Sequence, residues 1–175
     1  GYWIFDDLAL LRQADTDSLG DSPHLFQPSP ALRTQGRTAE NPVHQGKNPP
    51  PGAVLHYWLP AELPADAKFE LSISDSNGDA IRSYTRKPAR DDESKPEGAD
   101  DDRLLTANAG LNSLVWNLRY PSVKRFDKLV LWNDYLDGPR AVPGIYTATL
   151  TAGDTVLPVP IEVRQDPRST ATPEA

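Results

Sequence analysis

Hydrophobic and polar residues alternate along much of the second half of the chain. In KFELSISD, residues 68–75, every second residue is apolar and its neighbours are polar, and GIYTATLT, residues 144–151, has a similar period of two. Such alternation is typical of a half-buried β-strand. Together with less regular apolar runs, the pattern predicts six strands, over residues 54–59, 68–75, 80–85, 111–119, 144–151 and 155–163.

Short turns connect these segments and indicate the fold class. The segment DSNGD, residues 75–79, joins the second and third strands, and its Asn77-Gly78 pair favours a tight hairpin with positive φ. Residues 152–154 join the last two strands in the same manner. No segment carries a sustained apolar period of 3.6 residues, as a long amphipathic helix would. Strands at this spacing, with Gly and Pro turns, predict an all-β sandwich over residues 52–166.

The first 51 residues differ in composition from the rest. Residues 1–14 combine a short apolar strand, YWIF, with a helical turn from Leu8 to Gln13. Because four apolar residues cannot stabilise a strand alone, we expect the last strand of a preceding domain, or a strand that joins the main sheet. Residues 15–51 hold seven of the 18 prolines and predict a connector that packs along a surface and ends in stiff polyproline II. Residues 167–175 predict a disordered tail.

Two long loops interrupt the predicted strands. Residues 86–103 carry seven carboxylates, five basic residues and no large apolar side chain between them, so we expect this loop to be mobile. Residues 120–143 keep several large apolar side chains, including Trp132 and Tyr135. We therefore expect the second loop to pack on the rest of the domain.

Charge and composition exclude several classes of protein. The net charge of −7 disfavours binding to nucleic acid or to an anionic membrane, because neither polyanion would be attracted. The chain has no Cys, and therefore no thiolate nucleophile and no Cys-based metal site. It contains no apolar stretch long enough for membrane insertion and no signal peptide. The absence of Met, even at position 1, suggests a domain excised from a longer chain.

Motifs for catalysis, metals and cofactors are missing from the sequence. His24, His44 and His56 show neither HxH nor HExxH spacing, so no metal site is predicted. The 75–79 turn resembles the start of a calcium loop, but Ala80 stands where Gly is required and the final Glu is also missing. There is no nucleophile elbow, phosphate loop or dinucleotide fingerprint. The sequence therefore predicts no enzyme and no cofactor.

Two other functions stay open. Two facing carboxylates would suffice for a glycoside hydrolase, and the acids nearest to aromatic residues are Asp6, Asp7, Asp134 and Asp137. Their placement is better explained as strand stops and turn formers.

Aromatic residues could instead form a binding platform. Trp132 and Tyr135, with Trp58 and its neighbour Tyr57, could stack a sugar ring or a peptide. The competing interpretation, which we favour, is that Trp116 fills the core while Trp132 pins its loop over one sheet.

Four segments carry a resemblance to a known family. They are YWIFDDLALLRQ from Tyr2, NPPPGAVLHYWL from Asn48, GLNSLVWNLRYP from Gly110 and GPRAVPGIYTATL from Gly138. In this order they resemble the C-terminal region of large bacterial sortilin-like or BNR-repeat exported proteins, which are often labelled glycosyl hydrolases. The strand and turn pattern is also similar to the immunoglobulin-like or fibronectin-like domains of flagellar hook-capping proteins and secretion-sorting tails.

This resemblance implies a specific domain arrangement. A β-propeller would lie upstream, with residues 2–5 in its last blade, and an immunoglobulin-like or fibronectin-like antiparallel β-sandwich would follow. The expected role is a non-catalytic accessory domain that packs on or caps the propeller in a periplasmic or secreted protein. No catalytic residue carries over from the family.

Overall fold

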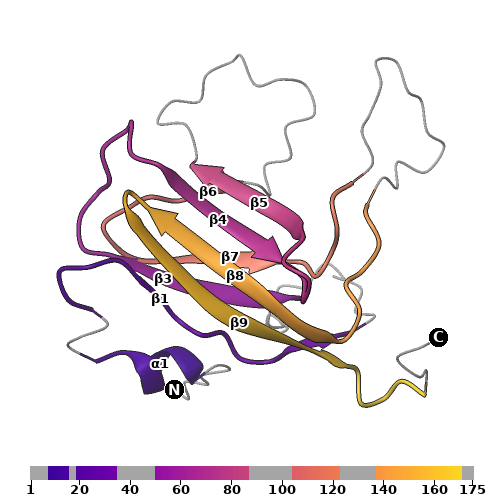
Figure 1. Ribbon diagram of the computed structural model, residues 1–175. Helices are drawn as coiled ribbons and strands as arrows, with labels where there is room; N and C mark the ends of the chain where they lie inside the picture. The colour runs from indigo at the N-terminus through magenta and orange to yellow at the C-terminus, as the bar shows by residue number, and fades with distance from the viewer. Residues whose placement is uncertain (1–7, 16–18, 35–49, 87–103, 123–136, 171–175) are drawn as a thin grey trace, which may run out of the picture.

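Two β-sheets make up the structure, a computed structural model that describes residues 8–15, 19–34, 50–86, 104–122 and 137–170 (Figure 1). A short helix, α1 (Ala9–Gln13), precedes the strands and confirms the predicted helical turn. The strands are β1 (His24–Leu25), β2 (Ala31–Arg33), β3 (Ala53–Leu59), β4 (Phe69–Ser74), β5 (Ala80–Arg86), β6 (Leu104–Leu105), β7 (Gly110–Trp116), β8 (Gly144–Ala152) and β9 (Thr155–Gln165).

The strands form a three-stranded sheet in the order β1-β3-β7 and a six-stranded sheet in the order β2-β9-β8-β4-β5-β6. Neighbouring strands are antiparallel except for β2 with β9 and β5 with β6. In Figure 1 the strands β5, β4, β8 and β9 form the nearer layer, and β7 and β3 lie behind them. The all-β prediction is confirmed, and each of the six predicted strands is present.

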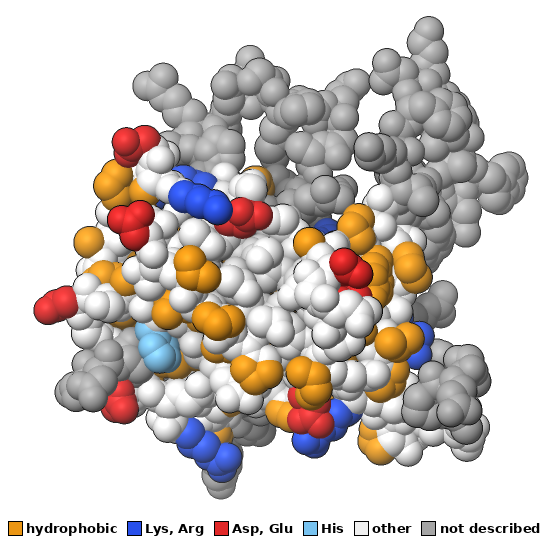
Figure 2. Space-filling view, viewed as in Figure 1, with side chains coloured by type: hydrophobic (Ala, Val, Ile, Leu, Met, Phe, Trp, Pro, Cys, Tyr) orange, Lys and Arg blue, Asp and Glu red, His pale blue; other side chains and the backbone are white. Residues whose placement is uncertain are grey.

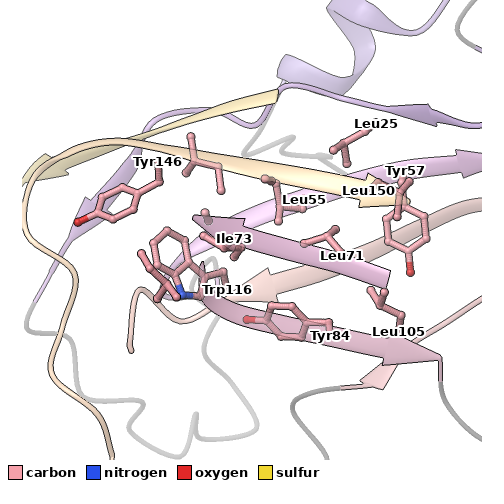
Figure 3. Close-up of a cluster of buried hydrophobic side chains, with 14 of the residues drawn as sticks. Leu25, Leu55, Tyr57, Leu71, Ile73, Tyr84, Leu105, Trp116, Tyr146 and Leu150 are labelled. Atoms are coloured by element: carbon pink, nitrogen blue, oxygen red, sulfur yellow. The ribbon is translucent and has the colours of Figure 1, made fainter. Parts of the chain in front are cut away.

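One hydrophobic core lies between the two sheets. Burial alternates along β3, so that Leu55 and Tyr57 are fully buried. They belong to the same buried cluster as Leu71 and Ile73 of β4 and Leu150 of β8 (Figure 3). Full burial of one such aliphatic side chain contributes about 1.5–3 kcal/mol, so this alternation is the main local reason for the fold.

An aromatic pair joins the two sheets near the end of β7. Trp116 is fully buried, as predicted, and its ring lies edge-on to Tyr146 of β8 with 5.2 Å between the ring centroids. The indole Nε1 of Trp116 donates a hydrogen bond to the carbonyl oxygen of Arg119 (3.1 Å). The Tyr146 hydroxyl donates to the carbonyl oxygen of Val142 (2.9 Å). The pair therefore also fixes both ends of the segment between β7 and β8.

The strand predicted over residues 111–119 ends earlier, at Trp116. The chain turns at Leu118, which has a positive φ of 56°. Beyond the turn, Arg119 forms an isolated antiparallel bridge with Arg140, and the Tyr120 amide donates to the Pro139 carbonyl oxygen at 2.9 Å. The base of the 120–143 loop is thus closed by backbone pairing, while residues 123–136 lie outside the described ones.

The proline-rich connector contributes to both sheets, which the sequence analysis did not predict. β1 pairs antiparallel with β3, and β2 pairs parallel with β9. These strands have two and three residues, too few for the apolar period to be visible in the sequence. Three predictions concern residues outside the described ones: the strand expected at residues 2–5, the acidic loop from residue 87 onward and the last five residues of the tail.

The hairpin between β4 and β5 forms where it was predicted, but with a different turn. The Asp75 carboxylate oxygen Oδ1 accepts hydrogen bonds from the amides of Asn77 (2.9 Å) and Asp79 (3.0 Å). Gly78 has a φ of 85°, whereas Asn77 is not among the residues with positive φ. Of the pair predicted to supply the positive φ, Gly78 alone does so, and the Asp75 side chain caps the turn.

Gly52 permits the close approach of β3 and β7 and provides a test of the fold. A Cβ at this position would lie 2.1 Å from the carbonyl oxygen of Trp116, and Gly52 has a φ of 139°. We expect Gly52→Ala to destabilise the domain by about 2–4 kcal/mol, because it adds a backbone clash to an unfavourable φ. Gly78→Ala is the control, since its φ is also positive but a Cβ there would meet nothing within 4 Å. Chemical denaturation measures both, and equal losses would contradict this account.

Candidate functional site

The outer face of the three-stranded sheet carries apolar and aromatic side chains that could bind a partner. Val54, His56 and Trp58 of β3 point to this side, because their neighbours in the strand are buried in the core. On β7, Leu111 and Val115 lie on the same side, and the register places them opposite Trp58 and Val54. We call this surface the outer face.

The described residues before β1, 8–15 and 19–23, are held beside the outer face by side-chain hydrogen bonds; we call them the leader. Gln13, at the end of α1, makes two hydrogen bonds with the backbone of Gln27. The Gln13 Nε2 donates to the Gln27 carbonyl oxygen (2.8 Å), and the Gln27 amide donates to the Gln13 Oε1 (2.9 Å). The indole Nε1 of Trp58 donates to the carbonyl oxygen of Gly20 (3.0 Å). Each described part of the leader is therefore attached to the rest of the domain, one through Gln13 and the other through Gly20.

One aromatic side chain after β1 is buried outside the core between the sheets. Phe26 is 1% exposed, yet it does not belong to the core cluster between the sheets. Its ring packs edge-on to His24, with 4.7 Å between ring centroids, and its amide donates to the carbonyl oxygen of His56 (3.0 Å). Because Leu25 between them points into the core, Phe26 is on the outer side, next to Gln27, which bonds Gln13 of the leader.

Beyond β1 the chain crosses to the other sheet. β2 pairs with the end of β9, and the Arg140 guanidinium donates to the carbonyl oxygen of Thr34 (2.6 Å) just after β2. Arg140 itself belongs to the backbone bridge at the base of the 120–143 loop. Residues 19–34 thus connect both sheets and the base of that loop.

Three leucines around α1 and in the leader are exposed; we call them the leader leucines. Leu8, Leu11 and Leu19 are 45%, 55% and 40% exposed. Leu8 and Leu11 are three residues apart at the start of a helical turn and therefore lie on the same side of it. Single exposed leucines are common, but three within twelve residues form a candidate contact surface for another domain. The missed signal was the spacing of Leu8 and Leu11.

Of the predicted ligand-binding residues, the structure describes Trp58. Its side chain is half-buried, and its N–H is already bonded to Gly20. Trp132 and Tyr135 lie outside the described residues, so a glycan or peptide site built on them stays a prediction. Tyr57, the fourth aromatic of that hypothesis, points into the core rather than toward Trp58.

The candidate carboxylates are only partly described. Asp137 forms an ion pair with Arg119, with 3.5 Å between Oδ2 and Nε, whereas Asp6, Asp7 and Asp134 lie outside the described residues. Among the residues that the structure describes, no group of three His, Asp or Glu side chains could hold a metal ion. His24 and His56 share the outer face, and His44 is not described.

Two of the buried tyrosines, Tyr57 and Tyr146, act as hydrogen-bond donors. Burial raises the pKa of Tyr57 although its hydrogen bonds to Thr106 lower it, and the phenol donates to the Thr106 carbonyl oxygen at 2.7 Å. Burial is also the largest cause of the raised pKa of Tyr146, followed by the neighbouring Tyr120. Both hydroxyls stay protonated near neutral pH and serve to fix loops.

The outer side of the six-stranded sheet carries both polar and apolar side chains. Figure 2 shows the outer side of the six-stranded sheet, where hydrophobic side chains are scattered among polar ones. Thr147, Thr149 and Thr151 of β8 point to this side. In the described ranges, no helix has the length and apolar character needed to cross a membrane. The leader and the outer face are candidate interaction surfaces because both carry exposed apolar side chains.

The Trp58 hydrogen bond provides a test of leader attachment. Trp58→Phe keeps an aromatic ring on the outer face but removes the donor to Gly20. We expect amides of residues 19–27 to exchange with solvent about fivefold faster, since a hydrogen bond contributes about 1 kcal/mol, while the core strands keep their protection. Trp116→Phe is the matched control, because it removes an indole N–H from the core and should lower protection throughout. Unchanged exchange in the leader of Trp58→Phe would show that this bond does not hold it.

Comparison of the chain with known protein families, curated proteins and solved structures finds no match.

Proposed function

We propose that this chain is a non-catalytic accessory domain, an immunoglobulin-like β-sandwich that packs on an upstream β-propeller in a larger exported protein. The observation that carries the proposal is the integration of residues 19–34 into both sheets. A flexible tether would need no such attachment. A segment that is bonded to Trp58, to β3, to β9 and to Arg140 instead fixes the direction from which the chain enters.

The strand order supports an immunoglobulin-like sandwich. With β3, β4, β5, β7, β8 and β9 taken as strands B, C, C′, E, F and G, one sheet contains B and E and the other contains C′, C, F and G. The first strand is divided between the sheets, as β1 and β2. The Tyr146 hydroxyl, at the start of the strand equivalent to F, bonds the backbone four residues upstream, which is the arrangement of a tyrosine corner.

The leader leucines support the accessory role. They lie on the N-terminal side of the sandwich, where a preceding domain would be attached, and they would lose most of their exposed apolar surface against it. Burying apolar surface contributes about 25 cal/mol per Å², so even a small contact would favour one relative orientation of the two domains. This orientation, rather than chemistry, is the proposed contribution of the chain to a periplasmic or secreted parent protein.

The experiment uses the parent protein with its upstream domain. We expect the double substitution Leu8→Ser and Leu11→Ser to separate a shared thermal unfolding transition into two, because the domains would no longer stabilise each other. Differential scanning calorimetry measures the transitions, and limited proteolysis should show faster cleavage near α1. The control is Val156→Ser, which replaces a residue that is 58% exposed on β9, away from the leader.

Two results would contradict the proposal. Identical calorimetric traces for the parent protein and the leader variant would show that the leucines make no domain contact. Turnover by this chain of a glycoside substrate, abolished by replacing a single carboxylate such as Asp137, would show that it is an enzyme.

A further inference from the structure

β7 departs from the usual placement of polar and apolar side chains at three positions, although Trp116 and Leu114 point inward as expected. Asn112 points into the core and is 6% exposed, with its Nδ2 donating to the carbonyl oxygens of Asn108 (2.7 Å) and Gly110 (3.0 Å). Leu111 and Val115, in contrast, point outward and are 50% and 37% exposed. In a half-buried strand, apolar side chains ordinarily point inward and polar ones outward. A strand that buries an amide and exposes two branched apolar side chains departs from this alternation, and such departures are expected at functional surfaces.

The hydrogen bonds of β3 show which way the backbone of β7 faces. The Phe26 amide donates to the carbonyl oxygen of His56, so the backbone groups of His56 face β1. In an antiparallel ladder, the N–H and C=O of one residue point to the same side, and successive residues alternate. Leu55 and Tyr57, on either side of His56, therefore face β7.

The same alternation applies to β7. Its residues opposite Leu55 and Tyr57 are Leu114 and Asn112, so these two bond β3. Leu111, Ser113 and Val115 consequently present their N–H and C=O groups at the other edge. In the described part of the chain, no strand pairs with that edge. Leu111, Ser113 and Val115, whose backbone groups face this edge, also have their side chains on the outer face.

This edge lacks the usual protection against strand pairing. Pro158 and Pro160 of β9 have no N–H, and β2 covers only the last residues of that strand. Prolines at alternate positions are a common device for blocking an edge. β7 contains no proline and no charged residue, although the chain carries a net charge of −7. A neutral, unblocked edge is where a second copy would meet the least repulsion.

We propose that β7 is a homodimerisation edge, with a second copy of this chain pairing antiparallel to it across a two-fold axis at Ser113. In this register Ser113 faces Ser113 of the second copy, and Leu111 faces Val115 of the second copy. Each of these pairs exchanges both backbone N–H···O bonds, and apolar side chains meet apolar ones on the outer face. The interface is self-complementary, as a two-fold interface requires, and it joins the three-stranded sheets of both copies.

The dimer does not depend on the function proposed above, because it uses neither the leader leucines nor a preceding domain. Charge substitution at Ser113 tests it with the full chain. Ser113→Lys and Ser113→Asp each place like charges opposite one another, so we expect each variant alone to be monomeric. An equimolar mixture should recover the dimer, since Lys then faces Asp. Sedimentation equilibrium measures the mass, relative to 19.2 kDa for the monomer.

Controls separate this interface from misfolding or other contacts. Thr85→Lys adds the same charge at an exposed position of β5 and should leave the dimer intact. Because the chain has no Cys, Ser113→Cys introduces a single thiol, and paired Cα atoms about 5.5 Å apart permit a disulfide between copies. Oxidation should cross-link Ser113→Cys and leave Thr85→Cys uncross-linked, even if the charged variants fold poorly.

Three outcomes would overturn the proposal. The first is a monomeric wild-type chain at every concentration up to the millimolar range. The second is a dimer that both charged variants leave unchanged. The third is a mixture of folded charged variants that stays monomeric, because the loss of the dimer would then not come from opposed residues at position 113.

Discussion

The contact between Trp116 and Tyr146 determines how the two sheets sit together. Their ring centroids lie 5.2 Å apart inside the core. The Trp116 indole N–H and the Tyr146 hydroxyl each also hold a neighbouring segment of backbone through a hydrogen bond. Because side chains alternate with a period of two, an inward Trp116 also turns Leu114 and Asn112 inward. The outward position of Leu111 follows from the same constraint. The composition of the outer face is therefore a consequence of core packing at one end of β7.

The sheet edges at β9 and at β7 reflect different solutions to the same physical problem. A strand edge exposes donors and acceptors that another strand can satisfy. β9 removes donors with Pro158 and Pro160 and receives β2 at its end, whereas β7 keeps all of its donors. The fold thus combines a protected edge in the larger sheet with an available edge in the smaller one.

The sequence predicted what depends on local periodicity. Strand β4 was predicted because its alternation is regular, and the hairpin after it was predicted because Asn77-Gly78 is a strong turn pair. β1 and β2 were missed because two or three residues carry no period, and their pairing with β3 and β9 is decided by tertiary contacts. Even for the hairpin, the choice of turn depended on hydrogen bonds of the Asp75 carboxylate, which composition alone does not specify.

The candidate surfaces were harder to predict than the fold. Trp58 was singled out as an aromatic ligand platform, but its N–H bonds Gly20, a contact between residues 38 apart that no sequence pattern reveals. Leu111 and Val115 drew no attention, because an apolar residue in a strand is ordinarily assigned to the core. Their exposure becomes evident only when the phase of β7 is set by Trp116.

The parallel pairing of β2 with β9 has a mechanical consequence. The two strands lie side by side although they come from opposite ends of the domain sequence, with Ala31 next to Val163 and Arg33 next to Gln165. Tension between the two ends of the chain pulls β2 backward and β9 forward, so it acts along the strands in shear. The backbone hydrogen bonds between the two strands then share the load and break together instead of one after another. A strand of only three residues can therefore determine the force at which the domain yields.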